Sequence, residues 1–195
     1  MVPAAGLVLA AGNSRRFGSA KLLAALDGRP LLQHVLDVAA EVRLHPVVVV
    51  LGADAPALRQ ACSWRDEVLV VNPDPDAGLS GSVRLGLAQL AFSQVQRAVV
   101  LLGDQPRLSA KQLRSILAAP ADETRPIVVP RYGGSPGNPV LLERAVWPMA
   151  SGLAGDAGMS QLIRSRPALV RYLDVAGDNP DVDTPADLDV LESRS

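Results

Sequence analysis

Three basic residues follow a short apolar run near the N-terminus of this chain. The stretch LVLAAGNSRRFGSAK, from Leu7 to Lys21, begins as a buried β-strand and passes through small residues to Arg15, Arg16 and Lys21. Small residues let backbone N–H groups approach an anion closely, and the cations add charge-assisted hydrogen bonds. The stretch is therefore typical of a phosphate-binding turn. The alternative is an ordinary strand-to-helix turn with solvated cations.

The glycine spacing separates this turn from the two common phosphate-binding motifs. Gly12 and Gly18 are too far apart for G-x-x-x-x-G-K-[ST], Ser19 follows Gly18, and the stretch does not fit G-x-G-x-x-G. Ligands of parallel sheets bind beyond the carboxyl ends of the strands. The anion hypothesis therefore depends on the cations and on the expected position of the turn at such an edge.

A carboxylate suited to a divalent cation follows a later apolar run. Asp104 lies in LLGDQP, directly after AVVLL. Mg²⁺ prefers one or two carboxylates together with phosphate oxygens and water, and the end of a strand is a suitable position for such a ligand. The alternative is that Asp104 only shapes a turn before Pro106.

Two polar segments could contact substrates. The first, NPDPDAGLSGSVRLGL, offers Asn72, Ser80 and Ser82 to the edge of a nucleobase, although Ser80 would equally suit a helix N-cap. The second, PRYGGSPGNP, carries Arg131, Tyr132 and Asn138 and has the composition of a loop that closes over a second substrate. Arg131 would then meet a substrate phosphate. The alternative is a polar hairpin tip without a ligand.

The elements that position these residues alternate along the first half of the chain. Four continuous, mostly β-branched apolar runs predict strands covered on both faces, at 7–10, 46–51, 68–71 and 98–102. Helical spacing follows Pro30 and Pro56, which suit first-turn positions, and recurs over 83–91. This alternation predicts an α/β fold, a three-layer sandwich with a mainly parallel, Rossmann-like sheet.

The second half is less regular. A helix capped by Ser109 is expected first, and further strands and helices are expected at 127–130 (strand), 139–149 (helix), 157–165 (helix), 168–175 (strand) and after Pro185 (helix).

Composition limits the classes of protein to consider. The chain has 195 residues, 48% of them hydrophobic, which is enough for one domain spanning 1–195 with a substantial core. Its net charge of −1 and its few aromatic residues favour neither nucleic acid nor a membrane surface as a partner. The single cysteine, Cys62, and the lack of a signal or spanning segment predict a cytoplasmic protein.

Several motifs together resemble one family over nearly the whole chain. L-A-A-G-x-S-x-R-x-G followed by Lys21 resembles the signature of MobA-like nucleotidyltransferases. Ordered segments further along resemble those of molybdenum cofactor cytidylyltransferases, namely GLSGSVRLGL, LLGDQPRLS, GNPVLL, GDAGMSQLI and DVDTPADL. The chain departs from this pattern at Asn138, where G-H-P is common, and at Ser160, where an Arg is common.

The resemblance implies a reaction and its substrates. CMP would pass from CTP to the phosphate of molybdopterin cofactor, with release of pyrophosphate and with Mg²⁺ as the cofactor. A-A-G in place of A-G-G after the first strand accompanies cytidine transfer in the family. A molybdenum hydroxylase apoenzyme could then receive the product. Two alternatives stay open: transfer to a sugar or polyol phosphate, and a non-catalytic carrier of molybdenum cofactor.

The resemblance also assigns roles to residues of this chain. Asp183 in DVDTP resembles a second metal ligand beside Asp104, although it could instead cap the helix after Pro185. Lys21, Arg16 and Asp104 are the expected catalytic residues. The expected nucleotide contacts are Leu9, Ala10, Ala11, Gly12, Arg15, Arg16, Lys21, Asn72, Ser80, Ser82 and Asp104, and the expected acceptor contacts are Arg131, Tyr132 and Asn138. All of this requires Lys21 and Asp104 to converge on one triphosphate.

Overall fold

A central eight-stranded sheet organises the computed structural model, which describes residues 3–12, 17, 20–155 and 158–193. The strands follow the order β10, β7, β9, β6, β1, β4, β5, and β8 pairs with β7. Their bounds are β1 (Ala5–Ala10), β4 (Val47–Leu51), β5 (Val68–Val71), β6 (Arg97–Leu102), β7 (Ile127–Tyr132), β8 (Ser135–Pro136), β9 (Val140–Glu143) and β10 (Val170–Asp174). The pairs β1–β4, β1–β6, β4–β5 and β7–β10 are parallel. The sheet is thus mainly parallel, as predicted.

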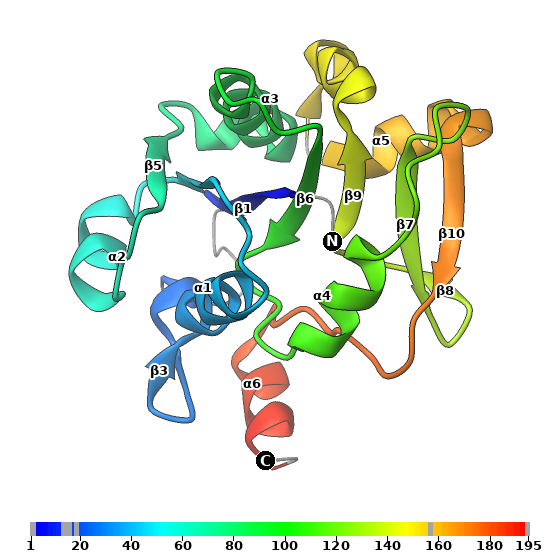
Figure 1. The fold of residues 1–195 in the computed structure, drawn as a ribbon. Helices are drawn as coiled ribbons and strands as arrows, with labels where there is room; N and C mark the ends of the chain where they lie inside the picture. The colour runs from blue at the N-terminus through cyan, green and yellow to red at the C-terminus, as the bar shows by residue number, and fades with distance from the viewer. Residues whose placement is uncertain (1–2, 13–16, 18–19, 156–157, 194–195) are drawn as a thin grey trace.

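Helices cover both faces of this sheet. On one face lie α1 (Leu31–Glu41), α2 (Ala55–Ala61) and α4 (Ala110–Leu117); on the other lie α3 (Leu79–Leu90), the 3₁₀ helix η3 (Arg144–Gly152) and α5 (Gly158–Ser165). Figure 1 shows α1 and α4 below the strands and α3 and α5 above them. The prediction of an α/β three-layer sandwich is therefore confirmed.

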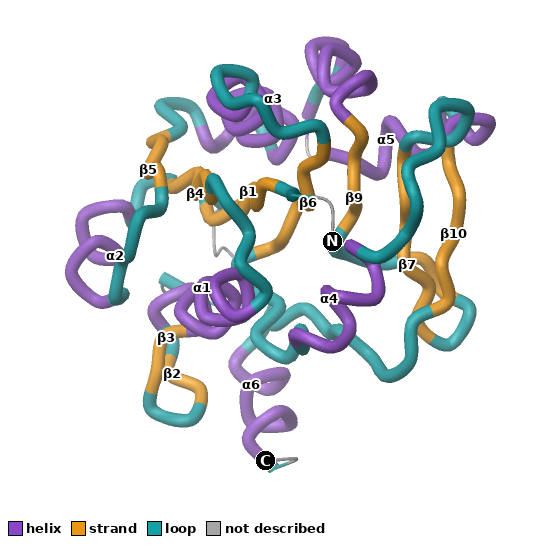
Figure 2. Tube along the Cα trace, viewed as in Figure 1, coloured by secondary structure: helices purple, strands orange, loops and turns teal. Residues whose placement is uncertain are grey.

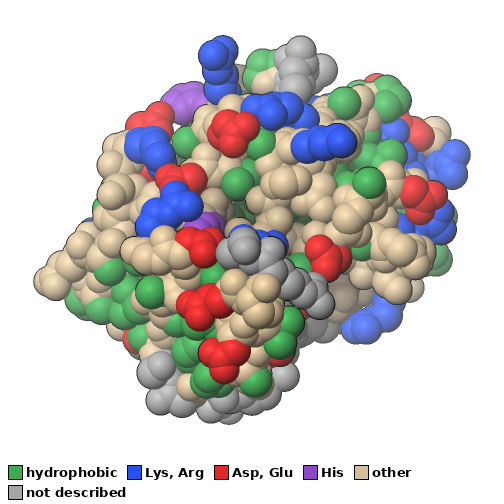
Figure 3. Space-filling view, turned by 90° about the horizontal axis from the view of Figure 1, so that it is seen from below, with side chains coloured by type: hydrophobic (Ala, Val, Ile, Leu, Met, Phe, Trp, Pro, Cys, Tyr) green, Lys and Arg blue, Asp and Glu red, His purple; other side chains and the backbone are tan. Residues whose placement is uncertain are grey.

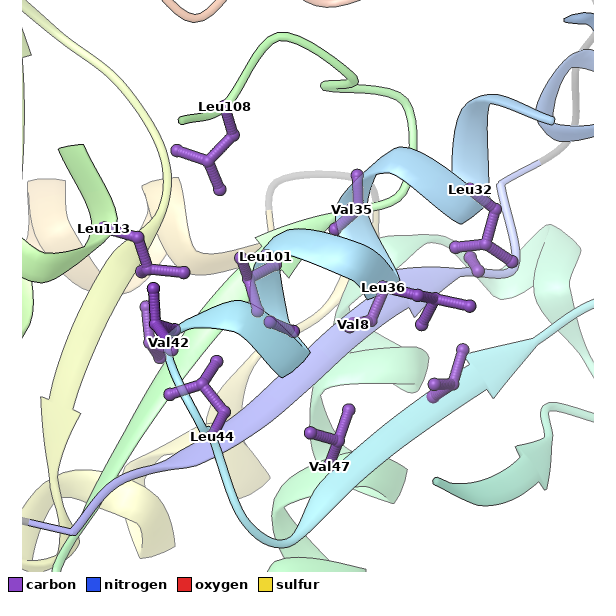
Figure 4. Packing of buried hydrophobic residues seen from close by; sticks show 14 of the residues in the cluster. Val8, Leu32, Val35, Leu36, Val42, Leu44, Val47, Leu101, Leu108 and Leu113 are labelled. Atoms are coloured by element: carbon purple, nitrogen blue, oxygen red, sulfur yellow. The ribbon is translucent and has the colours of Figure 1, made fainter. Parts of the chain in front are cut away.

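The alternation of side chains along the central strands explains why both faces are covered. In β1, Val8 packs in the cluster under α1 and α4, whereas Leu7 packs in the cluster under α3. Every residue of β1 is buried, as expected for a strand with helices on both sides. Figure 4 shows Val8 and Leu101 facing Val35 and Leu36 of α1.

Two expectations about strands and helices were wrong. The helix expected over 139–149 is instead β9 followed by η3. Val140 and Leu142 join one core cluster and Leu141 joins the other, so this run fills both faces of the sheet as an antiparallel strand between β6 and β7. In addition, β5 is not covered on both faces: it is an edge strand, with Val68 38% and Val71 48% exposed.

Smaller elements complete the chain. A hairpin joins β2 (Ala25–Leu26) to β3 (Arg29–Pro30), and its turn residues Asp27 and Gly28 both have positive φ. Pro30 therefore ends a strand and caps α1, whereas Pro56 lies in the first turn of α2 as predicted. The others are η1 (Lys21–Leu23), η2 (Pro75–Ala77), η5 (Pro167–Leu169) and α6 (Pro185–Glu192).

The charge of the surface and the length of the helices both bear on possible partners. The face shown in Figure 3 carries acidic and basic side chains intermixed. Within the described part of the chain, every helix is too short or too polar to cross a lipid bilayer.

Candidate functional site

The site lies at the edge where the parallel strands β1, β4 and β6 end. The N–H of Gly103, just after β6, donates to the carbonyl of Leu9 at 2.9 Å, so the turns after β1 and β6 are tied together. A Cβ at Gly52, after β4, would lie 2.9 Å from the carbonyl oxygen of Ala11. Only glycine at position 52 therefore lets the first turn come this close.

Lys21 brings three distant segments together at this edge. It is the first residue of η1, and its Nζ donates to Asp104 Oδ2 at 2.7 Å and to Asp183 Oδ1 at 3.3 Å. Its side chain is 13% exposed, so the ammonium is held largely out of water. The structure therefore places Lys21 and both expected metal ligands in one cluster, although they come from the beginning, the middle and the end of the chain.

The structural alternatives for the two aspartates can now be compared with the geometry. Thr184, not Asp183, is the N-cap of α6, and its side chain accepts from the N–H of Asp187. The carboxylate of Asp183 is thus left to contact Lys21. Asp104 does lie in the turn after β6, and its carbonyl accepts from the N–H of Val182, but its carboxylate also points to Lys21.

A third carboxylate belongs to this cluster and was not among the expected site residues. Partial burial of the Asp181 carboxyl, together with the nearby charge of Asp104, raises the pKa of Asp181. Its Oδ1 accepts from Gln105 Nε2 at 2.7 Å. The D-x-D spacing of DVDTP was the available signal, but it did not show which aspartate faces Lys21.

The donor set fits Mg²⁺ bound together with a nucleotide. Asp104 and Asp183 converge on one cation, the ammonium of Lys21, and offer hard oxygen ligands. Within the described ranges, no group of three or more His, Cys, Asp or Glu side chains forms a metal cage. Two carboxylates completed by phosphate oxygens and water are what Mg²⁺ prefers.

The first turn can contact a nucleotide mainly through its backbone. The side chains of Leu9, Ala10 and Ala11 are buried in the two core clusters, whereas Gly12 is exposed, with open space around its Cα. Arg15 and Arg16 lie outside the described residues. Their expected roles, including catalysis by Arg16, therefore stay predictions.

Asn72, Ser80 and Ser82 form a buried polar group between β5 and the start of α3. Asn72 Nδ2 donates to Ser82 Oγ at 3.1 Å, and Asn72 Oδ1 accepts from the N–H of Asp74. Ser80 is not the N-cap of α3, because that position is Gly78. Ser80 is fully buried, and its Oγ has no hydrogen-bond partner among the described residues.

The expected acceptor residues are already engaged within the protein. Arg131 makes a two-pronged ion pair with Asp174, at 2.9 and 3.0 Å, and its guanidinium lies 5.5 Å from the ring centroid of Tyr172. An acceptor phosphate would have to compete with Asp174 for Arg131. The segment is a β-hairpin, β7–β8, with Gly133 and Gly134 at positive φ in its turn, not a loop without secondary structure.

Tyr132 and Asn138 contact each other beside this hairpin. Tyr132 Oη donates to the carbonyl of Asn138 at 2.9 Å, and burial raises the pKa of Tyr132 to about 12. The same carbonyl accepts from Asn179 Nδ2 at 3.0 Å. Asn179 and Gln105 were missed from the sequence because side-chain amides that bind distant segments give no periodic signal.

Comparison with known proteins identifies the family. Residues 6–171 match the MobA-like NTP transferase domain. The chain is 32% identical to nicotine blue oxidoreductase of Paenarthrobacter nicotinovorans, over 92% of this chain and 91% of that protein. It belongs to the MobA-like NTP transferase family.

Two further relatives agree with this membership. Purine catabolism protein PucB of Bacillus subtilis is 30% identical over 95% of this chain and 94% of its own length. The crystal structure of Rv0371C from Mycobacterium tuberculosis, in complex with manganese, superposes with a TM-score of 0.86 at 33% identity and covers all of both chains. This MobA-like chain thus shares its architecture with a relative in which a divalent metal is bound.

Proposed function

We propose that this protein transfers CMP from CTP to the phosphate of molybdopterin cofactor in a Mg²⁺-dependent reaction. The observation that supports the proposal most directly is the convergence of Lys21 on Asp104 and Asp183 at the carboxyl edge of the sheet. A cation beside two carboxylates is the combination that binding of a triphosphate and its metal requires.

In the proposed reaction, a phosphate oxygen of the acceptor attacks the α-phosphorus of CTP. The bond between the α-phosphorus and the bridging oxygen to the β-phosphate breaks, and pyrophosphate leaves. Such transfers need alignment and charge neutralisation more than a protein nucleophile. The ammonium of Lys21 would neutralise charge on the departing pyrophosphate.

The carboxylates have a separate part in this proposal. Asp104 and Asp183 would hold Mg²⁺, which polarises the phosphate and neutralises its negative charge. Among the described residues, one ammonium lies near the carboxylates of Asp104, Asp181 and Asp183, and this surplus of negative charge also favours a divalent cation. The relative with bound manganese supports a divalent metal of this type.

CTP is proposed as the nucleotide on two grounds. The first is the A-A-G sequence at Ala10, Ala11 and Gly12, which resembles cytidine-specific members of the family. The second is the polar group near the start of α3, where Ser80 Oγ has no hydrogen-bond partner among the described residues, although it is fully buried and a base edge would reach it only after α3 moves. A pyrimidine edge presents both donors and acceptors, which hydroxyl and amide side chains can pair.

The acceptor is proposed from the names and motifs of relatives. PucB is named for purine catabolism, and molybdenum hydroxylases are the recipients that the family resemblance implies. One relative carries the name of an oxidoreductase, which describes a different reaction class.

One assay separates these functions. Pyrophosphate release is measured with CTP, Mg²⁺ and molybdopterin cofactor, and each component is omitted in turn. The proposal expects release only in the complete mixture, and it expects GTP to compete poorly. Release with a sugar or polyol phosphate instead would identify another acceptor. Binding of the cofactor without release would indicate a carrier.

A further inference from the structure

The segment that carries Asp183 is an extended connection between β10 and α6. Residues 176–183, here called the strap, cross beneath α4 to reach α6, as the loop tracing in Figure 2 shows. A connection of this length without secondary structure would ordinarily be mobile. Its contacts therefore decide how well Asp183 is positioned opposite Asp104.

Gln112 of α4 fastens the first part of the strap. Its Nε2 donates to the carbonyls of Ala176 at 3.1 Å and Asp178 at 2.9 Å, while its Oε1 accepts from Ser109 in the capping box. Gly177 lies between the two carbonyls with a φ of 87°, and a Cβ there would be 3.1 Å from Gln112 Nε2. This contact fixes where the strap enters the site.

Gln105 fastens the second part, directly beside the metal-binding residues. It follows Asp104 and is only 4% exposed. Its Nε2 donates to Asp181 Oδ1 at 2.7 Å, and its Oε1 accepts from Asn179 Nδ2 at 2.9 Å. One buried amide therefore binds the strap on both sides of residue 180, at Asn179 and at Asp181, and Asp181 is two positions from Asp183.

The backbone and the core complete this attachment. The N–H of Val182 donates to the carbonyl of Asp104 at 3.0 Å, and the side chain of Val182 is fully buried with Leu26 and Leu31. The Asp183 N–H is held by Asp187 Oδ2 at 3.0 Å. The strap is thus held on each side of Asp183, and Gln105 is the tether that joins it to the turn carrying Asp104.

We infer that Gln105 is a positioning residue that, through its hydrogen bond to Asp181, sets the carboxylate of Asp183 opposite that of Asp104. This inference depends on the proposed metal site and adds a determinant of its affinity. Hydrogen bonds that orient metal ligands commonly change metal affinity by about ten- to a hundredfold. The effect should therefore fall on metal binding more than on the turnover rate at saturating metal.

Asp181 offers a matched pair of variants that tests the tether without disturbing the core. Both Asp181→Asn and Asp181→Ala remove the same negative charge. Only asparagine keeps an oxygen that can accept from Gln105 Nε2. Mn²⁺ affinity in the presence of CTP, measured by electron paramagnetic resonance, should be about tenfold weaker in Asp181→Ala than in Asp181→Asn.

Gln105→Met supplies an independent arm of the experiment. In this background the two Asp181 variants should bind Mn²⁺ equally, since the hydrogen bond is already gone. The Michaelis constant for Mg²⁺ should rise, while kcat at saturating Mg²⁺ changes less. If Gln105→Met does not fold, the Asp181 pair alone decides.

The outcomes separate the inference from the proposed function. Equal Mn²⁺ affinities of Asp181→Ala and Asp181→Asn, with strong binding by the wild-type protein, would overturn only the role of Gln105. Failure of the wild-type protein to bind Mn²⁺ with CTP would overturn the metal site and this inference with it. A lower unfolding temperature in Asp181→Ala with unchanged Mn²⁺ affinity would show a structural role only.

Discussion

The ion pair between Lys21 and Asp104 is the central contact of the candidate site. Their atoms lie 2.7 Å apart, and the ion pair is mostly shielded from water, with side-chain exposures of 13% and 23%. A cation this close to two carboxylates offsets part of the electrostatic repulsion between them. The same carboxylates are those proposed to hold Mg²⁺.

The Asp104→Asn variant tests whether the negative charge of the Asp104 carboxylate is needed for activity. Asparagine preserves the shape and the turn after β6 but removes the charge that a metal needs. We expect turnover to be abolished even at saturating Mg²⁺, while the protein stays folded and loses about 1–3 kcal/mol in the free energy of unfolding, because Lys21 keeps Asp183 as a partner. Near-normal pyrophosphate release by this variant would contradict the role proposed for Asp104.

Cys62 provides a second prediction at this scale. Its thiol is buried, and burial together with the nearby charge of Asp37 raises the pKa of Cys62 to about 11. The thiolate fraction at pH 8 should then be about a hundredfold lower than for the ordinary thiol pKa of 9.0. Alkylation by iodoacetamide should be correspondingly slow in the native protein and normal in urea. Rapid labelling without urea would show that α2 opens readily.

At the scale of elements, the N-terminus of α6 holds the strap and shapes the site. Thr184 and Asp187 form a capping box in which each side chain accepts from the other residue's N–H. The matching box of α4 uses Ser109 and Gln112. Both capping boxes also contact the strap: Gln112 binds its first part, and Asp187 binds the N–H of Asp183.

Removal of either N-cap should lower the free energy of unfolding by a similar amount, but the two variants should differ in metal binding. Thr184→Ala and Ser109→Ala are each expected to destabilise the protein by about 1 kcal/mol in urea unfolding. Thr184 adjoins Asp183, whereas Ser109 reaches the strap only through Gln112, so loss of Thr184 should raise the Michaelis constant for Mg²⁺ more than loss of Ser109. An equal rise in both variants would indicate a general loss of order instead.

The acid sensitivity of α6 follows from the same capping box. Hydrogen bonds from the Thr184 hydroxyl and from the backbone N–H groups of Thr184 and Asp183 lower the pKa of Asp187. Because the folded pKa is below the unfolded one, this stabilisation is present above about pH 4 and is lost as the pH falls through the folded value. The stability difference between wild-type protein and Asp187→Asn should therefore shrink below about pH 4, which urea titrations at several pH values can measure.

At the scale of the whole molecule, Arg97 joins the parallel and antiparallel parts of the sheet. It is 2% exposed, and its Nε lies 3.1 Å from Glu143 Oε1, directly opposite across β6 and β9. Its two terminal nitrogens donate to the carbonyls of Leu117 and Ala119 at the end of α4. One buried guanidinium thus connects three elements.

Removal of the Arg97 guanidinium should strongly destabilise the protein. Arg97→Met leaves Glu143 without its cation and two carbonyls without donors, so we expect a loss of about 3–5 kcal/mol in the free energy of unfolding. The double variant Arg97→Met/Glu143→Leu should recover part of it, because no buried charge then stays unpaired. A double variant less stable than Arg97→Met would show that packing, not charge, dominates.

The secondary structure of the first half was largely determined by local sequence. Buried β-branched runs and helical spacing are read over a few residues, so the parallel strands β1, β4 and β6 and the helices between them could be predicted. The N-cap at Ser109, later in the chain, was visible for the same reason, whereas its capping box with Gln112 was not predicted. Where two elements compete for an apolar run, as at Val140–Glu143, local pattern does not decide. There, the space between β6 and β7 selects a strand.

The residue types of the candidate site were also determined by sequence, but their arrangement was not. Lys21 lies 83 positions from Asp104 and 162 from Asp183, and a local pattern carries no information about contacts of that separation. Only the tertiary structure shows that Thr184 caps α6, that Asp174 holds Arg131, and that Gln105 tethers the strap. The physical reason is that strands and helices follow from short-range periodicity, whereas the partner of a buried charge or amide depends on which distant segments the sheet brings to its carboxyl edge.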